Sequence, residues 1–346
     1  MNLARRKFCR IFSLGAAGLL LKTPFPFSSR PRVPGDQRFK DNKLKIRVIG
    51  LGAVGTKSID HMIGMGLRDV DFTVINADQG SLNESLCPSK VLLGGSLAKG
   101  NGCGMNPEMG YACAQRSRET IARILRGSDV VILVAGLGGG TGTGGAPVVA
   151  GIAKDVDAVS IGVVTMPFYY EGRWRLRNAQ EGLKKLEEAS DLVIPIPNES
   201  IFNFFSTQAF LTDVFAKSIE VVSLAASKVA DLYFDTGSDC LDFLNKEHLF
   251  SGLGPTYLGI GGDGESSILR AAQKAIRFPL LSNVPFDRAR KVIYTLRVCG
   301  QHRLIDVRAA SRIIEESFSG RTDFISNVII DKKDRTEVVL FVSGFA

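Results

Sequence analysis

The chain has 346 residues, a length that suggests two domains. Its composition is 45% hydrophobic and 23% charged, which is ordinary for a globular protein and excludes disorder throughout. The formal net charge of +8 is unevenly distributed, since residues 1–47 carry +10 and the remainder carries −2. The basic character therefore belongs to an N-terminal arm, and a nucleic-acid-binding body is not supported.

The numbers and positions of cysteine, histidine and glycine residues exclude further classes of protein. The six cysteines form no C-x-x-C pair and the three histidines are scattered, so neither a zinc site nor a disulfide scaffold is expected. We expect free thiols in a reducing compartment. The 37 glycines cluster in loops without a period of three, which excludes collagen and indicates a backbone that approaches a ligand closely.

Residues 1–43 are expected to form a basic arm followed by a Pro-rich linker. Two arginines, Arg5 and Arg6, precede an apolar run at 11–21, which is shorter than the roughly 20 residues that a membrane-spanning helix needs. This order resembles a twin-arginine export signal, although Cys9 stands where leucine is usual and no A-x-A cleavage site follows. An interfacial anchor, a leader without function and a true start near residue 43 remain open.

From residue 43 onward, apolar runs alternate with helical stretches. The runs typical of strands buried on both faces lie at 44–49, 72–75, 130–134, 159–164 and 192–196. This alternation indicates an α/β fold with a mostly parallel sheet. Ligands of such sheets bind at the carboxyl ends of the strands, where the Gly-rich and Asn/Asp-rich segments of this chain fall.

The later part of the chain has a different pattern. Residues 211–233 are predicted to form one long helix, because apolar residues recur at spacings of three and four. A further helix is predicted at 265–277, and apolar runs follow at 291–299 and 336–342. These elements indicate a smaller α+β domain.

The first glycine loop, Gly50-x-Gly52-x-x-Gly55, follows a predicted strand and opens a helix. This is the form of the dinucleotide fingerprint, and Asp78 lies about 20 residues further on. However, any phosphate ligand benefits from glycine backbone amides at a helix N-terminus. The interpretation as a nicotinamide oxidoreductase would depend on this loop alone, and no catalytic constellation of His or Lys residues supports it.

The second glycine tract is more specific. Seven of the ten residues in 136–145 are glycine, and two of the others are threonine. An anion-binding nest of this length suits the three phosphates of a nucleoside triphosphate. The chain contains no G-x-x-x-x-G-K-[ST] motif, which excludes a P-loop enzyme.

The segment Gly138–Gly144, Gly-Gly-Gly-Thr-Gly-Thr-Gly, resembles the signature of the tubulin/FtsZ superfamily, and of the FtsZ division GTPases in particular. Further similar segments lie at 74–79, 104–108, 165–173, 196–199, 241–243, 259–261 and 344–346. The resemblance implies a Rossmann-like GTPase domain, a long central helix and a smaller α+β domain. The expected boundaries are 1–43 for the arm, 44–210 for the GTP-binding domain, 211–235 for the central helix and 236–346 for the C-terminal domain.

The resemblance also implies a GTP/GDP site, with Mg²⁺ held mostly by phosphate oxygens and water. The glycine loops would wrap the phosphates, and the loop at 102–106 would sense the γ-phosphate. Asn198 would bind the base and Phe215 would stack on it, unless Phe215 is core. Glu171 and Arg175 would contact the ribose and guanine neighbourhood, unless they form a solvated ion pair. The candidate nucleotide-binding residues are Gly52, Ala53, Val54, Gly55, Thr56, Lys57, Asn76, Asp78, Gly104, Asn106, Gly138, Gly139, Gly140, Thr141, Gly142, Thr143, Gly144, Pro167, Glu171, Arg175, Asn198, Phe215 and Ile219.

Several of these positions depart from the family pattern. Ile219 stands where the family has a base-binding aspartate, which predicts weaker purine specificity unless Glu220 substitutes. Ala53 and Val54 replace glycines, so both must keep a negative φ. Lys57 either places a cation near the phosphates or points to solvent.

The loop expected to support GTP hydrolysis departs most from the family pattern. In the family, an Asn-x-Asp-x-x-Asp loop from one subunit completes the GTP site of the next. Here Asp242 is retained, whereas Cys240 and Asn245 replace the first Asn and the second Asp. Since an amide cannot accept a proton from water, and a general base is worth about 10²–10⁴-fold in rate, we expect slow hydrolysis. Glu247 is a further candidate base.

The expected function is therefore an FtsZ-like GTP-binding protein that assembles head-to-tail with itself or co-assembles with another FtsZ. The alternative is a non-polymerising regulator of FtsZ filaments. In the family, the chain usually continues past the folded body with a linker and an adaptor-binding peptide that reaches the membrane. The present sequence stops at residue 346, where the folded body is expected to end. We therefore expect the basic arm, residues 1–22, to provide the membrane contact instead. We expect a cytoplasmic location at the inner face of the membrane, because export would remove the protein from GTP. No nucleic-acid partner is expected.

Overall fold

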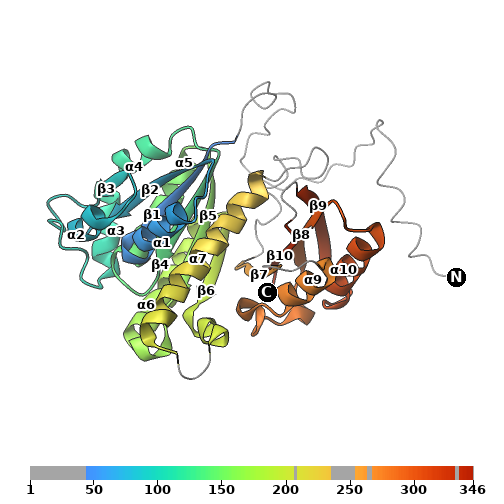
Figure 1. The fold of residues 1–346 in the computed structure, drawn as a ribbon. Helices are drawn as coiled ribbons and strands as arrows, with labels where there is room; N and C mark the ends of the chain where they lie inside the picture. Colours follow the sequence, from blue (N-terminus) through green and yellow to red (C-terminus); the bar gives the residue numbers. More distant parts are fainter. Residues whose placement is uncertain (1–43, 206–208, 235–253, 263–266, 332–334, 346) are drawn as a thin grey trace, which may run out of the picture. The chain divides into compact units, whose positions relative to one another are not determined.

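The computed structural model of the chain describes residues 44–205, 209–234, 254–262, 267–331 and 335–345 (Figure 1). By its contacts the chain divides after Lys43, and the description below concerns the unit that begins at Leu44. The N-terminal arm, with its twin arginine, lies outside the described residues.

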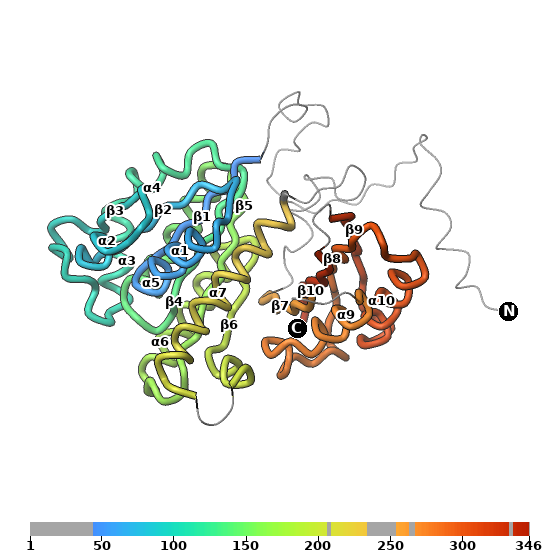
Figure 2. Tube along the Cα trace, viewed as in Figure 1, coloured from blue at the N-terminus to red at the C-terminus, as the bar shows by residue number. Residues whose placement is uncertain are grey.

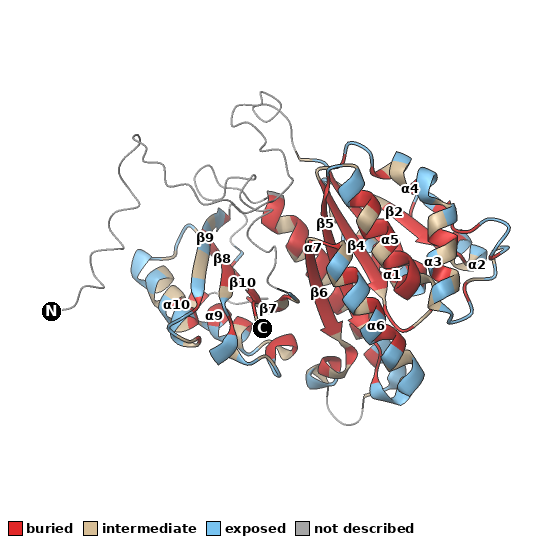
Figure 3. Ribbon diagram, turned by 180° about the vertical axis from the view of Figure 1, so that it is seen from behind, coloured by how far each residue is buried: buried red, intermediate tan, exposed pale blue. Residues whose placement is uncertain are grey.

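The first sheet has six parallel strands in the order β3-β2-β1-β4-β5-β6. All five predicted strands are present, and Figure 3 shows how thoroughly they are buried. The additional strand, β3, has three residues, which is too short to give a recognisable apolar pattern. The strands are β1 (Ile46–Leu51), β2 (Val70–Asn76), β3 (Lys90–Leu92), β4 (Val130–Gly136), β5 (Val159–Met166) and β6 (Leu192–Pro197).

Helices cover both faces of this sheet, as Figures 2 and 3 show from opposite sides. Alternate strand residues belong to different core clusters, one shared with α1 and α7 and the other with α3 to α6. The bounds are α1 (Gly52–Gly64), α2 (Gln79–Glu84), α3 (Pro107–Arg116), α4 (Arg118–Leu125), α5 (Thr141–Asp155), α6 (Arg173–Ala189) and α7 (Leu211–Phe234), with short 3-10 helices η3 (Tyr169–Glu171) and η4 (Asn198–Phe204).

The strand order reverses between β1 and β4. The chain runs from β1 into α1 and from β4 into α5, so both helices begin at the same edge of the sheet, next to each other. In open α/β sheets the crevice outside such a reversal is the usual ligand site. Both glycine loops lie there.

The long helix α7 agrees with the predicted 211–233 stretch, but its apolar stripe is not buried throughout. Val214, Val222 and Val229 are buried, whereas Leu211 is 54% exposed and Phe215 is 44% exposed. The stripe is therefore uncovered near the N-terminus of the helix, which periodicity alone cannot show. Among the described residues, no helix is long and apolar enough to cross a membrane.

The second sheet has the order β7-β10-β8-β9, with β10 antiparallel to both neighbours and β8 parallel to β9. The predicted runs at 291–299 and 336–342 form β8 and β10, and the predicted helix is α9. Strand β9 was not predicted, because exposed residues interrupt its apolar pattern. The bounds are β7 (Tyr257–Gly261), α9 (Ile268–Ile276), η5 (Pro279–Leu281), η6 (Phe286–Arg288), β8 (Lys291–Cys299), α10 (Leu304–Glu316), β9 (Asp323–Asp331) and β10 (Glu337–Ser343).

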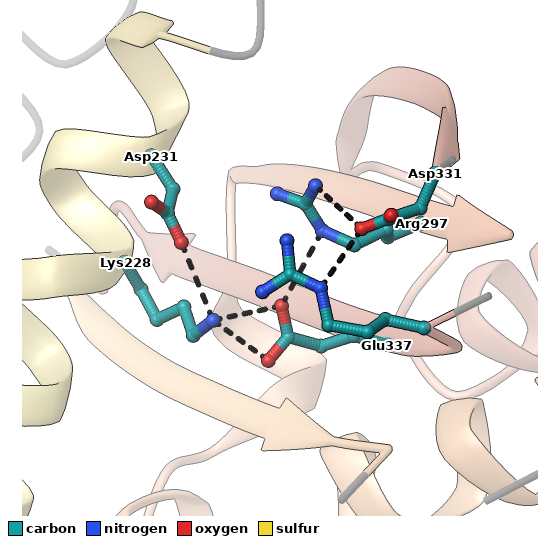
Figure 4. A network of polar contacts seen from close by, with 6 residues as sticks. Lys228, Asp231, Arg297, Asp331 and Glu337 are labelled. Atoms are coloured by element: carbon teal, nitrogen blue, oxygen red, sulfur yellow. Dashed lines mark hydrogen bonds and ion pairs between the residues drawn. The ribbon is translucent and has the colours of Figure 1, made fainter. Parts of the chain in front are cut away.

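An ion-pair network connects α7 with the second sheet (Figure 4). Lys228 on α7 lies 2.7 Å from Glu337 of β10 and 3.3 Å from Asp231. Arg297 of β8 lies 3.3 Å from Asp331 and 3.8 Å from Glu337. Apart from Asp231, these side chains are at most 20% exposed, so their charges depend on one another for compensation.

Candidate functional site

The N-termini of α1 and α5 form the centre of the candidate site. Gly52 begins α1 with a φ of 70°, and a Cβ atom there would lie 3.3 Å from the amide nitrogen of Gly142 in α5. Within the described chain, no side chain caps either helix. The first amides of both helices are therefore left for another acceptor, and an anion is the acceptor that this geometry and the helix dipoles favour.

Two nearby helices, α2 and α3, differ in this respect. Asp78 caps α2 by accepting a hydrogen bond from the Ser81 amide at 2.7 Å, and Asn106 caps α3 by accepting from the amides of Glu108 and Met109 at 2.9 and 3.3 Å. The hydrogen bonds from Ser81 hold the pKa of Asp78 below its usual value. Both side chains, predicted as nucleotide contacts, thus position loops of the site.

The second glycine tract divides into packing and open positions. A Cβ atom on Gly142 would overlap the carbonyl oxygen of Gly136, and one on Gly144 would overlap that of Pro107. A Cβ atom on Gly139 or Gly104 would meet nothing within 4 Å. Some glycines therefore allow α5 to pack closely, while the others border open space where a ligand can approach the backbone.

Two candidate side chains lie next to Gly138 in the glycine tract. The Gly138 amide donates to Thr143 Oγ1 at 2.8 Å, and Thr141 is the first residue of α5. Gly138 has a φ of 98°, and a Cβ atom there would lie 3.3 Å from the ring of Pro167. Thr143 therefore holds the tract by a hydrogen bond, and Pro167 lies beside Gly138.

The loop at 102–106 packs against this tract. Gly102 and Gly104 have φ values of 75° and 52°, and Met105 has 61°. A Cβ atom on Gly140 would lie 2.9 Å from the carbonyl oxygen of Asn106. The predicted γ-phosphate loop and the glycine tract are thus brought together.

The remaining residues of the first loop follow α1. Ala53 and Val54 lie in its first turn with negative φ, as their side chains require. Thr56 is buried and its Oγ1 lies 3.5 Å from Nδ2 of Asn76, which is also buried. Lys57 is exposed on the outer side of the helix.

Glu171 and Arg175 form an ion pair of 2.8 Å, with Glu171 12% exposed and Arg175 37% exposed. Glu171 also accepts a hydrogen bond from the Phe168 amide, so it is not a freely solvated carboxylate. The Nε atom of Arg175 is buried and has no hydrogen-bond partner among the described residues. A buried donor without an acceptor is costly, and a bound polar ligand would satisfy it.

Asn198 begins η4 and contacts the N-terminal part of α7, where Phe215 lies. Asn198 Oδ1 accepts a hydrogen bond of 2.7 Å from the hydroxyl of Ser218, and both residues are buried. This leaves the amide Nδ2 of Asn198 as the donor for a ligand. Phe215 is not core: its exposed ring meets Phe168 edge-on at 5.7 Å. Ser218 was not predicted to belong to the site, because its polar side chain next to Ile219 was the only indication in the sequence.

Glu220 does not lie where it could replace the missing aspartate at Ile219. Its carboxylate pairs with Lys217 at 2.7 Å and lines a pocket shared with α9. Consecutive residues of an α-helix point about 100° apart, so Glu220 and Ile219 project from different sides of α7. The interpretation that Glu220 substitutes is therefore not supported.

The hydrolysis loop, with Cys240, Asp242, Asn245 and Glu247, lies outside the described residues. Within the part of the chain that is described, no three His, Cys, Asp or Glu side chains gather as metal ligands. A cradle of backbone amides suits phosphate oxygens, which themselves can hold Mg²⁺.

Comparisons with known proteins agree with this geometry. Residues 45–206 match the family described as Tubulin/FtsZ family, GTPase domain. Over 276 residues the chain is 38% identical to the cell division protein FtsZ of Rickettsia conorii. The matched region covers 79% of this chain and 61% of that protein. An empty FtsZ dimer from M. jannaschii superimposes with a TM-score of 0.79 and 32% identity, covering 88% of this chain and 89% of that one. GDP-bound CetZ1 from Haloferax volcanii, at 22% identity, shares the fold with a TM-score of 0.73, covering 88% and 95%.

Proposed function

The chain belongs to the tubulin/FtsZ family, and we propose that it binds GTP and assembles head-to-tail into filaments, with itself or with another FtsZ, in cell division. The observation that carries this proposal is the pair of uncapped helix N-termini, α1 and α5, at the strand-order reversal. A head-to-tail interface uses two different surfaces, so it propagates unless it closes into a ring.

In this proposal the nucleotide lies across the carboxyl edge of the first sheet. The amides of the two glycine loops hold the phosphates, and Gly139 and Gly104 border the space that the phosphates occupy. Arg175 directs its unsatisfied Nε to the nucleotide, Asn198 Nδ2 donates to the base, and Phe215 covers it. Mg²⁺ would neutralise charge on the phosphates.

Hydrolysis in this proposal needs a second subunit. Asp242 of one subunit would polarise the attacking water at the nucleotide of the next, while Asn245 would orient that water without accepting its proton. Turnover is therefore slow. Restoring a carboxylate with Asn245→Asp should raise the rate by about 10²-fold or more.

The test is GTP turnover by the full chain, followed across protein concentration. Turnover per molecule that rises above a threshold concentration, and is abolished by Asp242→Asn, supports a site completed between subunits. Flat, near-zero turnover with GTP still bound, and no pelleting of polymer, would contradict assembly and support the alternative regulator. Asn245→Asp and Asp242→Asn, compared at equal concentration, separate the roles of the two positions.

We further propose that the basic arm holds the protein at the cytoplasmic face of the membrane. The net charge of +8 in residues 1–43 and the apolar run at 11–21 suit an anionic lipid surface. Sedimentation with anionic vesicles should be lost when residues 1–40 are deleted. Unchanged partition of the deletion variant would exclude this role.

A further inference from the structure

A pocket of about 620 Å³ lies between α7 and α9, away from the candidate nucleotide site. Its α7 wall contains Lys217, Glu220, Val221 and Leu224, whereas Ser218 projects from a different side of the helix, toward Asn198. The volume falls within the range of about 300–1,000 Å³ that is typical of ligand sites. None of the residues proposed to contact the nucleotide lines this pocket.

The pocket combines an apolar floor with cationic walls. Apolar side chains from several segments form the floor, among them Phe204 and Phe278, whose rings meet edge-on at 5.5 Å. Val221 contributes a buried surface beside them. An apolar floor of this kind, framed by polar residues, is the usual composition of a protein docking site.

Four cations and one carboxylate line the same pocket. Arg270 and Lys274 lie on α9 and Arg277 directly follows it. Lys217 lines the pocket from α7, with its ammonium 5.2 Å from the centre of the Phe204 ring. Glu220 offsets one of these charges through its 2.7 Å pair with Lys217. The described side chains that line the pocket therefore have a formal net charge of +3, whereas residues 48–346 as a whole carry −2.

The position of the α9 cations follows from a glycine in β7. A Cβ atom on Gly261 would overlap the carbonyl oxygen of Ala271, so only glycine allows α9 to lie this close to the strand. Arg270 and Lys274 occupy positions i and i+4 of α9 and share one face of the helix, and Arg277 is the residue that caps its C-terminus.

From this charge complementarity we propose that the pocket binds an acidic linear segment of a partner protein that carries one or two large apolar side chains. Carboxylates spaced along an extended chain can reach cations on both helices, which a single anionic group cannot do. The apolar side chains of that segment bury against the floor. The basic arm of this chain is excluded as the occupant by its own positive charge. This site is independent of the proposed GTP chemistry.

The test uses the full chain with GDP and a fluorescein-labelled peptide, acetyl-Glu-Asp-Leu-Asp-Phe-Glu-amide, followed by fluorescence anisotropy. We expect saturable one-to-one binding that weakens with added salt, because exposed charges are screened. The double variant Arg270→Glu/Arg277→Glu should weaken binding at least about tenfold. The matched control Lys185→Glu/Arg308→Glu makes the same change in net charge outside the pocket and should change the affinity less than about twofold.

All four substituted side chains are exposed, and an unchanged melting temperature and GDP affinity would confirm that the variants remain folded. A second peptide with Ala in place of Leu and Phe should bind at least about tenfold more weakly. The proposal fails if both double variants weaken binding equally, if the Ala peptide binds as well as the first, or if no saturable binding occurs. It also fails if phosphatidylglycerol vesicles, but not the peptide, bind in a manner that depends on Arg270 and Arg277.

Discussion

The identity of the residue at position 219 bears directly on base selection. The side chain of Ile219 cannot accept hydrogen bonds from guanine N–H groups, and Glu220 is engaged with Lys217. In the proposed site Asn198, which accepts a hydrogen bond from Ser218, would be left to read the base. The site should distinguish purines weakly, because one hydrogen-bonding partner at the base edge is absent.

Replacing Ile219 with Asp should strengthen GTP binding about 10- to 100-fold, since hydrogen bonds to a charged group contribute about 1.5–3 kcal/mol. ATP affinity should not increase in parallel. Competition of both nucleotides against a fluorescent GDP analogue measures this. Glu220→Gln is the control and should leave the affinities for GTP and ATP unchanged. A loss of GTP affinity in that variant would show that Glu220 does read the base.

The carboxylate of Asp78 makes a pH-dependent contribution to stability. The pKa of Asp78 is lowered by hydrogen bonds from Ser81, so the folded state favours the ionised form. The stabilisation is present above the unfolded pKa of about 3.9 and is lost as the pH falls through the lower pKa of the folded state.

Asp78→Ala should lower the free energy of unfolding by about 1 kcal/mol at pH 7, because α2 loses its cap. Asp78→Asn keeps an acceptor but loses the charge, at a cost of about 0.3–1 kcal/mol at pH 7. Urea unfolding of the wild type and Asp78→Asn should show this difference shrinking below pH 4. A difference independent of pH would mean that the charge of Asp78 does not contribute.

Close packing of α3 against α5 depends on glycine. A Cβ atom on Gly144 would overlap the carbonyl oxygen of Pro107 at the start of α3, where the candidate γ-phosphate loop ends. Gly144→Ala should therefore destabilise the protein by about 1–3 kcal/mol and weaken GTP binding, because the loop must move.

Gly151 provides a matched control on the same helix. A Cβ atom there would meet nothing within 4 Å, so Gly151→Ala should stabilise the protein by about 0.5–1 kcal/mol, the difference in helix propensity. Thermal unfolding and GTP titration of both variants measure the contrast. Equal effects of the two substitutions would show that the close contact at Gly144 is unimportant.

The network of Figure 4 joins the central helix to the second sheet. Lys228→Met removes the cation between Asp231 and Glu337 and leaves Glu337 with Arg297 at 3.8 Å. Because these side chains are largely buried, the variant should lose about 1–3 kcal/mol of stability in urea unfolding.

The exposed pair of Arg312 and Glu316 on α10 is the comparison, since its side chains are 77% and 62% exposed. Arg312→Met should be much less destabilising than Lys228→Met, because exposed ion pairs generally contribute little to stability. If Lys228→Met is no more destabilising than Arg312→Met, the network does not contribute to the attachment of α7 to the second sheet.

Local patterns in the chain were sufficient for the class of fold and for the position of the two glycine loops at helix N-termini. Buried parallel strands give continuous apolar runs, and a glycine tract at a helix start has few uses besides anion binding, so the five longer strands and both loops could be predicted. The short β3 and the edge strand β9 could not, because three residues are too few and β9 is half exposed.

The roles of individual side chains depended on long-range contacts. Ser218 orients Asn198 from 20 residues away, and the uncovered ring of Phe215 lies at the end of an otherwise buried stripe. None of these partners is encoded by spacing, because each arises where different elements meet. The cationic pocket has the same origin: its charges come from α7 and α9, which are neighbours in space and not in the chain.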